Sequence, residues 1–228
     1  MHSIEVYAVD FPLCKAQCQY TLIDPDRRPG PLAVVSHTDA AGGSMRSGKG
    51  VGMTIFPDIL TFSMWGKKIN GEVITSDGKG YEKLTSAWEL LGPLLKVCAA
   101  PDRVRNKQVV VMVDNEGAVR MYQKGWTTKC QLCNMILVAI NEMAVALNVD
   151  LFVEKIRRCS NNEAMAADAL SKADFVFFRK LMPKARPGPE RIPVALSMWI
   201  KDPKPDRFLG LKMLTEMSVK TKILGFNI

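Results

Sequence analysis

The chain has 228 residues, of which 47% are hydrophobic and 24% charged, as is usual for a folded globular protein. This length allows one sizeable core, or one core with a small appendage. The most apolar stretch, residues 135–147, contains Asn141 and Glu142 and is too short to cross a bilayer. The amino terminus lacks the basic start and apolar run of a secretory signal. These features argue against any membrane association and predict an intracellular protein of the cytoplasm or nucleus.

The net charge of +8 is unevenly distributed along the chain. Residues 176–228 contain 11 Lys/Arg and 4 Asp/Glu, a balance of +7, which leaves +1 for residues 1–175. A basic segment attached to a nearly neutral body indicates a polyanionic partner, and nucleic acid is the commonest one. The alternative is a basic surface that is merely solvated.

Six cysteines are expected to be reduced thiols, because disulfides are rare inside cells. Two pairs are close in sequence, Cys14/Cys18 and Cys130/Cys133. Nothing else in their spacing supports a zinc site. The second pair lies in a segment of helical periodicity, where small core residues are the simpler interpretation.

The first half of the chain begins with an extension and continues into strands. Residues 1–30 form an N-terminal extension that ends in the turn-rich stretch DPDRRPGP. Residues 31–40 are apolar and β-branched and predict a buried strand that ends in polar residues. Residues 50–56 and 59–65, separated by Pro57 and Asp58, predict a β-hairpin. Residues 81–100 are amphipathic and predict a helix that Pro93 kinks or divides.

The elements that follow alternate between strand and helix. Residues 109–113 predict a second buried strand, followed by helices at about 115–124 and 128–147. Residues 151–156 predict a third core strand, and residues 161–175 a helix. Residues 31–175 are therefore expected to form an α/β domain. Its sheet would have an antiparallel hairpin on one side and parallel strands on the other.

Residues 176–228 form a basic, Pro-rich C-terminal extension. Six prolines between Met182 and Pro205 predict a linker or an extended wrap. A short helix is expected at about 206–218, and its apolar face could pack back on the domain or bind a partner.

Four acidic residues stand in unusual surroundings. Asp39 and Asp114 each follow a core strand, so neighbouring strands would bring both carboxylates to the same edge of the sheet. Glu89 lies in the centre of the amphipathic helix, and Asp168 lies among alanines. An acid surrounded by apolar residues is costly unless it is paired or binds a cation. Two Mg²⁺ ions on these oxygens could activate a water and polarise a phosphodiester.

Each acid also has a simpler explanation when it is taken alone. Asp39 and Asp114 could cap the ends of their strands, and Glu89 could face solvent. Asp168 could pair with Lys172 at the i+4 position. Taken jointly, with this order of elements, the acids favour a metal site, because acids clustered in a cleft are usually functional.

Four segments carry a resemblance to a known family: HTDAAGGS before the hairpin, SAWELLGPLL on the long helix, VVVMVDNEGAV and AMAADALSKADF. They resemble the motifs of the ribonuclease H domain of retrotransposon reverse transcriptases, nearest to DIRS-type and related eukaryotic retroelements. The resemblance covers about residues 31–175. It implies a ribonuclease H-like fold with a mixed five-stranded sheet flanked by helices. It also implies a metal-dependent endonuclease that hydrolyses the RNA strand of RNA–DNA hybrids.

The resemblance further implies a role for each acid. Asp39 would bridge two Mg²⁺ ions, which Mn²⁺ could replace. Glu89 and Asp114 would complete one site and Asp168 the other. The expected partner is an RNA–DNA hybrid or another nucleic acid, with the polymerase domain of a reverse transcriptase as a further partner.

The chain departs from cellular ribonucleases H in the loop before the last predicted helix of the domain. This loop has no histidine, although a loop histidine assists water positioning or product release in those enzymes. His37 shares a strand face with Asp39, and a core or edge role is expected for it rather than a catalytic one. Cations that grip phosphates without reading sequence would suit a hybrid recognised by its shape. The candidate nucleic-acid-binding residues are Arg103, Arg105, Arg120, Lys124, Lys129, Arg157, Arg158 and Asn161.

Two other functions remain open. One is a domesticated retroelement fragment that binds nucleic acid or protein without cleaving. The other is an integrase or transposase of the same fold, which would need a glutamate on a helix well after Asp114. The chain offers Glu142, and Glu154 in a strand, whereas its last motif carries Asp168, so this alternative is weaker.

Overall fold

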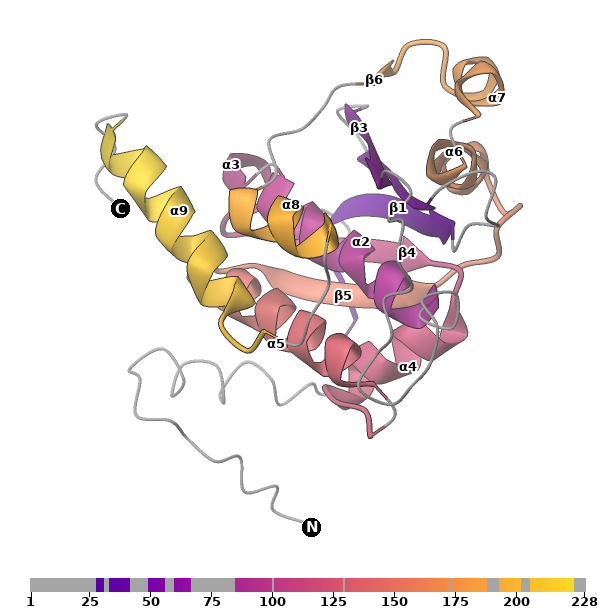
Figure 1. Ribbon diagram of the computed structural model, residues 1–228. Coiled ribbons are helices and arrows are strands. Elements are labelled where there is room, and N and C mark those ends of the chain that lie inside the picture. The colour runs from indigo at the N-terminus through magenta and orange to yellow at the C-terminus, as the bar shows by residue number, and fades with distance from the viewer. Residues whose placement is uncertain are drawn as a thin grey trace.

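The structure is a computed structural model that describes residues 28–30, 33–41, 49–55, 60–66, 85–99, 101–128, 130–172, 174–187, 193–201 and 206–223. Its sheet has the strand order β5-β4-β1-β2-β3-β6 (Figure 1). The strands are β1 (Val34–Ala41), β2 (Lys49–Ile55), β3 (Leu60–Gly66), β4 (Gln108–Val113), β5 (Asp150–Lys155) and β6 (Arg186–Pro187).

The pairing of the strands divides the sheet into two halves. Strands β1, β2 and β3 are antiparallel neighbours, and β1, β4 and β5 are parallel neighbours. The predicted α/β class, with a hairpin on one side and parallel strands on the other, is therefore confirmed. The sheet has six described strands where five were expected, because the two residues of β6 pair in parallel with β3.

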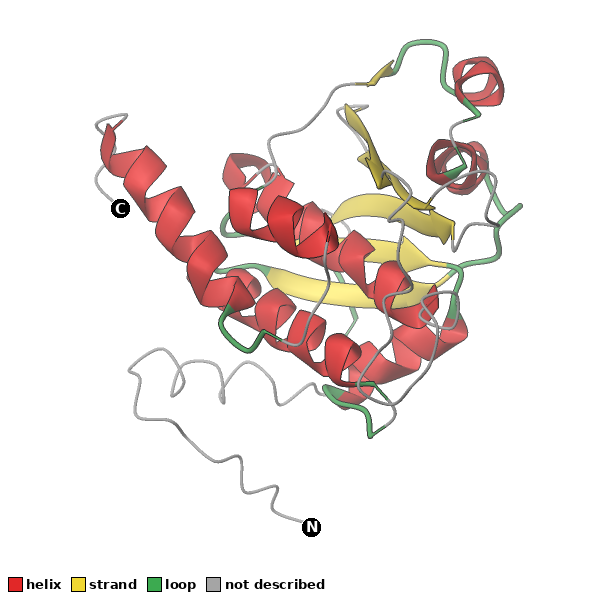
Figure 2. Cartoon of the chain, viewed as in Figure 1, coloured by secondary structure: helices red, strands yellow, loops and turns green. Residues whose placement is uncertain are grey.

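Eight described helices surround the sheet (Figure 2). They are α2 (Thr85–Ala99), α3 (Pro101–Val104), α4 (Glu116–Lys124), α5 (Gln131–Ala146), α6 (Asn162–Ser171), α7 (Phe175–Leu181), α8 (Val194–Lys201) and α9 (Leu209–Ile223). None of these helices combines the length and hydrophobicity needed to span a bilayer. The N-terminal extension lies almost entirely outside the described residues.

Helix α2 runs unbroken through Pro93, so of the two expected effects, a kink or a division, the division does not occur. A proline inside a helix removes one backbone hydrogen bond. Leu90, Leu91, Leu94 and Leu95 surround Pro93 and are all fully buried, which fixes the helix by packing on both sides of the missing bond.

The helix predicted over 161–175 is two helices instead. Helix α6 ends at Ser171, and α7 begins at Phe175. The physical reason is Asp174, whose carboxylate accepts a 2.9 Å hydrogen bond from the Phe177 backbone N–H and so starts a new helix.

The linker predicted over 182–205 is wrong at Val194–Lys201, which forms α8. Pro193 directly precedes this helix, a place where the missing N–H of proline costs no helical bond. Leu196 is fully buried and Trp199 is 7% exposed, and both belong to the main core. Apolar side chains that find a core outweigh the local signal of the prolines.

Helix α9 packs back on the domain, the first of the two alternatives expected for it. Its residues Leu209 and Met213 join the main core beside α5. The carboxylate of Glu216 accepts hydrogen bonds from the backbone N–H groups of Val194 and Ala195, at 2.7 and 2.8 Å. One side chain of α9 thus caps the amino-terminal end of α8.

Strand β1 is covered on both faces, and this places the candidate site. Alternation puts Thr38 on one face and His37 and Asp39 on the other. Helix α2 lies against the first face so closely that a Cβ on Gly92 would be 2.4 Å from Thr38 Oγ1. Helix α6 lies against the second face, where Ser171 donates a hydrogen bond to Asp39. In Figure 1, α6 and α7 lie together, away from α5 and α9.

Candidate metal centre

Three of the four predicted acids meet at one end of the parallel strands. Thr38 and Val113 are paired in the parallel register of β1 and β4, so the next residues, Asp39 and Asp114, lie side by side. Glu89 reaches them from α2. One carboxylate oxygen from each of the three lies within 4.8 Å of the other two. We call Asp39, Glu89 and Asp114 the carboxylate cluster.

The Arg158 side chain links Asp168 to this cluster, because it pairs with Asp168 and with Asp114. The Arg158 guanidinium lies 2.7 Å from Asp114 Oδ2, 3.1 Å from Asp168 Oδ1 and 3.6 Å from Asp39 Oδ1. Asp168 is also paired with Lys172 at 2.7 Å, as its simpler explanation required. The structure therefore places Asp168 beside the cluster, with two cations bound to it.

Burial and mutual repulsion perturb the acids of the cluster. Asp39 is 4% exposed, and burial raises its pKa to about 6, although the hydrogen bond from Ser171 acts in the opposite direction. Glu89 is 3% exposed, and burial, followed by the charges of Asp39 and Asp114, raises its pKa to about 9. Acids whose pKa values are perturbed in this way are typical of functional sites.

Glu89 provides a direct test of whether a cation fits. Its carboxylate accepts a hydrogen bond from the Ala40 backbone N–H. Its Oε2 is buried and has no hydrogen-bond partner among the described residues. A buried carboxylate oxygen without a partner is costly, and a hard divalent cation prefers this kind of ligand. The oxygens of the cluster fit Mg²⁺ or Mn²⁺.

Ser171 belongs to this site, and the sequence interpretation missed it. Its hydroxyl donates a 2.6 Å hydrogen bond to Asp39 Oδ2. Ser171 follows Asp168 by three residues on α6, so the two share a helix face. That spacing was the one signal in the sequence that could have identified it.

A cavity of about 10 Å³ lies between the strand ends and the start of α6, large enough for about one ion or water. Asp39, Asp114, Arg158 and His37 are among the residues that line it. His37 is 6% exposed, and burial lowers its pKa. Its Nε2 lies 3.2 Å from Asn161 Nδ2. Asn161 thus supports His37, while its Oδ1 caps α6 by accepting from the Ala164 N–H.

The other predicted nucleic-acid contacts are spread over the molecule. Arg103 and Arg105 precede β4, so they lie at the end of that strand opposite to Asp114. Arg120 and Lys124 are exposed on α4, with Arg120 paired to Glu116. Arg157 is exposed in the loop before α6. Lys129 lies outside the described residues, as do Cys14 and Cys18.

The second cysteine pair has a structural role. Cys130 Sγ accepts a 3.4 Å hydrogen bond from the Cys133 backbone N–H and caps the start of α5. Both are free thiols, and Cys133 is buried, as expected of small core residues.

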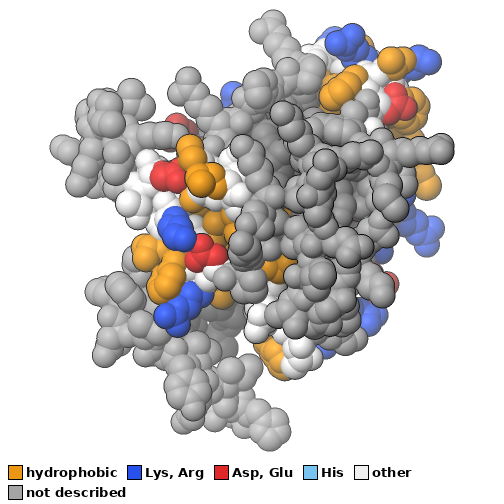
Figure 3. All heavy atoms as spheres, viewed as in Figure 1, with side chains coloured by type: hydrophobic (Ala, Val, Ile, Leu, Met, Phe, Trp, Pro, Cys, Tyr) orange, Lys and Arg blue, Asp and Glu red, His pale blue; other side chains and the backbone are white. Residues whose placement is uncertain are grey.

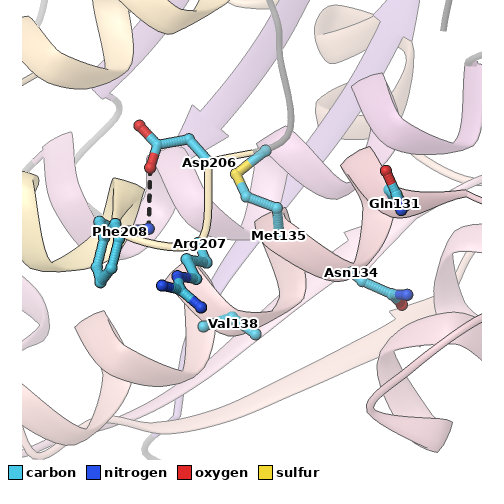
Figure 4. Close-up of a pocket in the computed structure, with 7 residues that line it drawn as sticks. All are labelled: Gln131, Asn134, Met135, Val138, Asp206, Arg207 and Phe208. Atoms are coloured by element: carbon cyan, nitrogen blue, oxygen red, sulfur yellow. Dashed lines mark hydrogen bonds between the residues drawn. The ribbon is translucent and has the colours of Figure 1, made fainter. Parts of the chain in front are cut away.

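A larger pocket, of about 530 Å³, opens at the start of α5 (Figure 4). It is lined by Gln131, Asn134, Met135, Val138, Asp206, Arg207 and Phe208. Its two charged groups are already engaged, since Asp206 pairs with Lys212 and Arg207 stacks on the Phe208 ring at 4.8 Å. No candidate catalytic acid lines it, so its size alone does not make it the active site.

Comparison with known proteins gives structural neighbours alone. No protein-family model matches the chain, and no curated protein matches it. The structure is similar to that of ribonuclease H1 from the halophilic archaeon Halobacterium salinarum NRC-1, at 13% identity and a TM-score of 0.45, over 63% of this chain and 98% of that one. It is also similar to LC11-RNase H1, isolated from compost by a metagenomic approach, at 15% identity and a TM-score of 0.41, over 63% and 98%. At these TM-scores the structural likeness is partial.

Proposed function

We propose that this chain is a ribonuclease H-like, metal-dependent endonuclease that hydrolyses the RNA strand of RNA–DNA hybrids. The observation that carries the proposal is the convergence of Asp39, Glu89 and Asp114, with oxygens within 4.8 Å of one another. These acids come from three separate segments of the chain, each of which carries one of the family-like motifs. The retroelement context, including a polymerase domain as partner, depends on the sequence resemblance alone.

Asp39, Glu89 and Asp114 would hold one Mg²⁺ or Mn²⁺, and Asp39 and Asp168 a second. A bound divalent ion generates a nucleophilic water at neutral pH and polarises the phosphodiester. The chain supplies the orientation of the ligands. Ser171 holds one oxygen of Asp39 in place, and the Ala40 N–H holds the Glu89 carboxylate. Both restraints come from packed helices and strands, which keeps the oxygens preorganised for cation binding.

Basic side chains beside the site would bind the phosphate backbone of the nucleic acid. Arg158 and Lys172 already lie against the acids, and both are about half exposed. Arg179 and Lys180 are exposed on α7, next to α6. Figure 3 shows Lys and Arg side chains beside hydrophobic ones in the region where Figure 1 places α7. Such cations bind phosphates without reading sequence, which suits a hybrid recognised by its shape.

A non-cleaving binding module is the second candidate, and one observation favours it. Arg158 pairs with three of the four acids and so neutralises part of their charge without any metal. The integrase alternative gains no such support. Glu142 accepts a hydrogen bond from the Leu211 backbone N–H and so lies against α9, outside the carboxylate cluster.

The test is cleavage of an RNA–DNA hybrid, labelled on the RNA strand, by the purified chain with Mg²⁺. Asp39→Asn and Asp114→Asn should each lower the rate by at least about 100-fold, because each removes a charged metal ligand. Asp102→Asn is the matched control, since Asp102 is exposed on α3. Cleavage that survives both cluster substitutions would remove the assigned site. If wild type and Asp114→Asn bind the hybrid equally and neither cuts it, the chain is the non-cleaving module.

A further inference from the structure

We propose that Arg158 is a resident counter-ion of Asp39, Asp114 and Asp168 and competes with divalent cations for these carboxylates, most strongly with the second ion. The inference rests on the proposed metal centre and adds a regulatory contact to it. Its basis is the position of one guanidinium group among carboxylates from three different elements, β1, the end of β4 and α6.

The Arg158 guanidinium contacts carboxylates that would also hold a divalent cation. Its Nη2 lies 2.7 Å from Asp114 Oδ2 and 3.6 Å from Asp39 Oδ1, and its Nε lies 3.1 Å from Asp168 Oδ1. A single positive charge thus faces three negative ones. Arg158 Nε donates a 2.8 Å charge-assisted hydrogen bond to Asp114 Oδ2, and the contacts with Asp39 and Asp168 are ion pairs. A divalent cation held by Asp39 and Asp168 would compete with the guanidinium for these two carboxylates.

The exposed fractions of the two side chains indicate that Arg158, and not Asp39, can move out of the contact. The side chain of Arg158 is 52% exposed, whereas that of Asp39 is 5% exposed. Arg158 extends from the loop between β5 and α6, so its guanidinium can move into solvent without unpacking either element. Asp39 is held by Ser171 in the middle of the sheet and cannot follow. A divalent cation would therefore bind these carboxylates as the Arg158 side chain moves away from them.

Arg158 contacts a ligand of each candidate metal position, Asp114 of the first and Asp168 of the second, but the second position is opposed more strongly. Asp168 is held by Lys172 at 2.7 Å as well as by Arg158, so two cations oppose a metal ion there. Glu89 Oε2, in contrast, has no hydrogen-bond partner among the described residues. The first divalent ion should accordingly enter at the Glu89 side and bind more tightly, because it competes with Arg158 for Asp114 alone. The second should bind weakly, because it competes with both Arg158 and Lys172 for Asp168.

The experiment is a Mn²⁺ titration of the full chain without nucleic acid. Binding is measured by calorimetry and by the electron paramagnetic resonance signal of free Mn²⁺. Arg158→Gln should tighten the weaker of the two binding steps about tenfold, since it removes the competing charge. Arg158→Lys, which keeps the charge but loses the forked geometry, should tighten it less. Arg157→Gln is the matched control. This substitution removes one positive charge from an exposed neighbour of Arg158 in the same loop. The Mn²⁺ affinities of the Arg157→Gln variant should therefore stay within about twofold of wild type.

The melting temperature, Tm, provides an independent readout and a check on folding. Without metal, Arg158→Gln should melt below wild type because three carboxylates lose their counter-ion, and saturating Mn²⁺ should remove that difference. Unchanged Mn²⁺ affinities in both Arg158 variants would overturn the role of Arg158 and leave the metal centre standing. If wild type and Arg158→Gln bind Mn²⁺ no better than Asp39→Asn does, the metal centre itself is wrong, and this inference with it.

Discussion

The Ser171 hydroxyl on α6 donates a 2.6 Å hydrogen bond to Asp39 Oδ2 on β1. Both side chains are buried, at 1% and 4% exposure. This bond joins the helix that carries Asp168 to the strand that carries Asp39. Together with the contact between Asn161 and His37, this hydroxyl group helps to fix the relative position of two of the four acids.

Ser171→Ala should destabilise the fold by about 1–3 kcal/mol, because it leaves a buried carboxylate oxygen without its donor. The hydrogen bond lowers the pKa of Asp39, so its loss should raise that pKa further and weaken Mn²⁺ binding at neutral pH. Urea unfolding and Mn²⁺ titration measure the two effects. Ser160→Ala, at an exposed loop position, is the control. Equal Mn²⁺ affinity in Ser171→Ala and wild type would show that Ser171 does not position Asp39.

The metal-free protein should lose stability as the pH rises. Folding raises the pKa of Asp39 from 3.8 to about 6 and that of Glu89 from 4.5 to about 9. Between these values the folded chain holds protons that the unfolded chain has released, so raising the pH favours unfolding. The loss should begin near pH 4 and continue to about pH 9. Urea unfolding from pH 5 to 9 measures it.

Mg²⁺ should act against this loss, because it binds the ionised carboxylates. Its affinity should rise from pH 6 to 9, and its binding should release protons, measurable as a buffer-dependent heat. Glu89→Gln is the control for the pH effect, since its amide does not titrate and the fall in stability above about pH 6 should flatten. A metal-free wild type whose stability does not change between pH 5 and 9 would contradict the raised pKa of Glu89.

Gly92→Ala should disturb the metal centre through the contact between α2 and β1. A Cβ at this position would lie 2.4 Å from Thr38 Oγ1 and 2.6 Å from Thr38 Cβ, so α2 must move away from β1. The expected cost is about 1–3 kcal/mol of stability, together with weaker Mn²⁺ binding, because Glu89 is on the same helix. Gly117→Ala, where the nearest atom is 3.1 Å away, should cost less. Urea unfolding and Mn²⁺ titration of both variants check this, and equal losses would mean that the contact with Thr38 is not tight.

Glu216→Ala should loosen the C-terminal helices without affecting the metal centre. It removes the acceptor for the Val194 and Ala195 backbone N–H groups, which is expected to cost about 1 kcal/mol. Urea unfolding should show this loss, while Mn²⁺ affinity stays that of wild type. Glu216→Gln, which keeps one acceptor oxygen, should lose less. A variant as stable as wild type would mean that the cap does not hold α8 in place.

Much of the architecture could be predicted from the periodicity of the sequence. The three acids of the carboxylate cluster could be predicted from their places on the expected strands and helix. Asp39 and Asp114 follow apolar β-branched runs, and parallel pairing of those strands brings them together. The sequence could not predict the surroundings of Arg158. A basic loop residue gives no sign of which acids it will face, so nucleic-acid binding was the natural interpretation. Helix α8 was missed because prolines dominate the local pattern, while the core that buries Trp199 is distant in sequence.

The anomalous scattering of Mn²⁺ in crystals of the chain would show directly whether the carboxylate cluster binds a divalent cation. We expect a Mn²⁺ peak bound by one oxygen each of Asp39, Glu89 and Asp114, at metal–ligand distances of about 2–2.5 Å. At higher Mn²⁺ concentration, a second peak should lie beside Asp168, with the Arg158 guanidinium turned away. Crystals grown in saturating Mn²⁺ that show no peak at these carboxylates would contradict the metal centre and the nuclease function proposed from it.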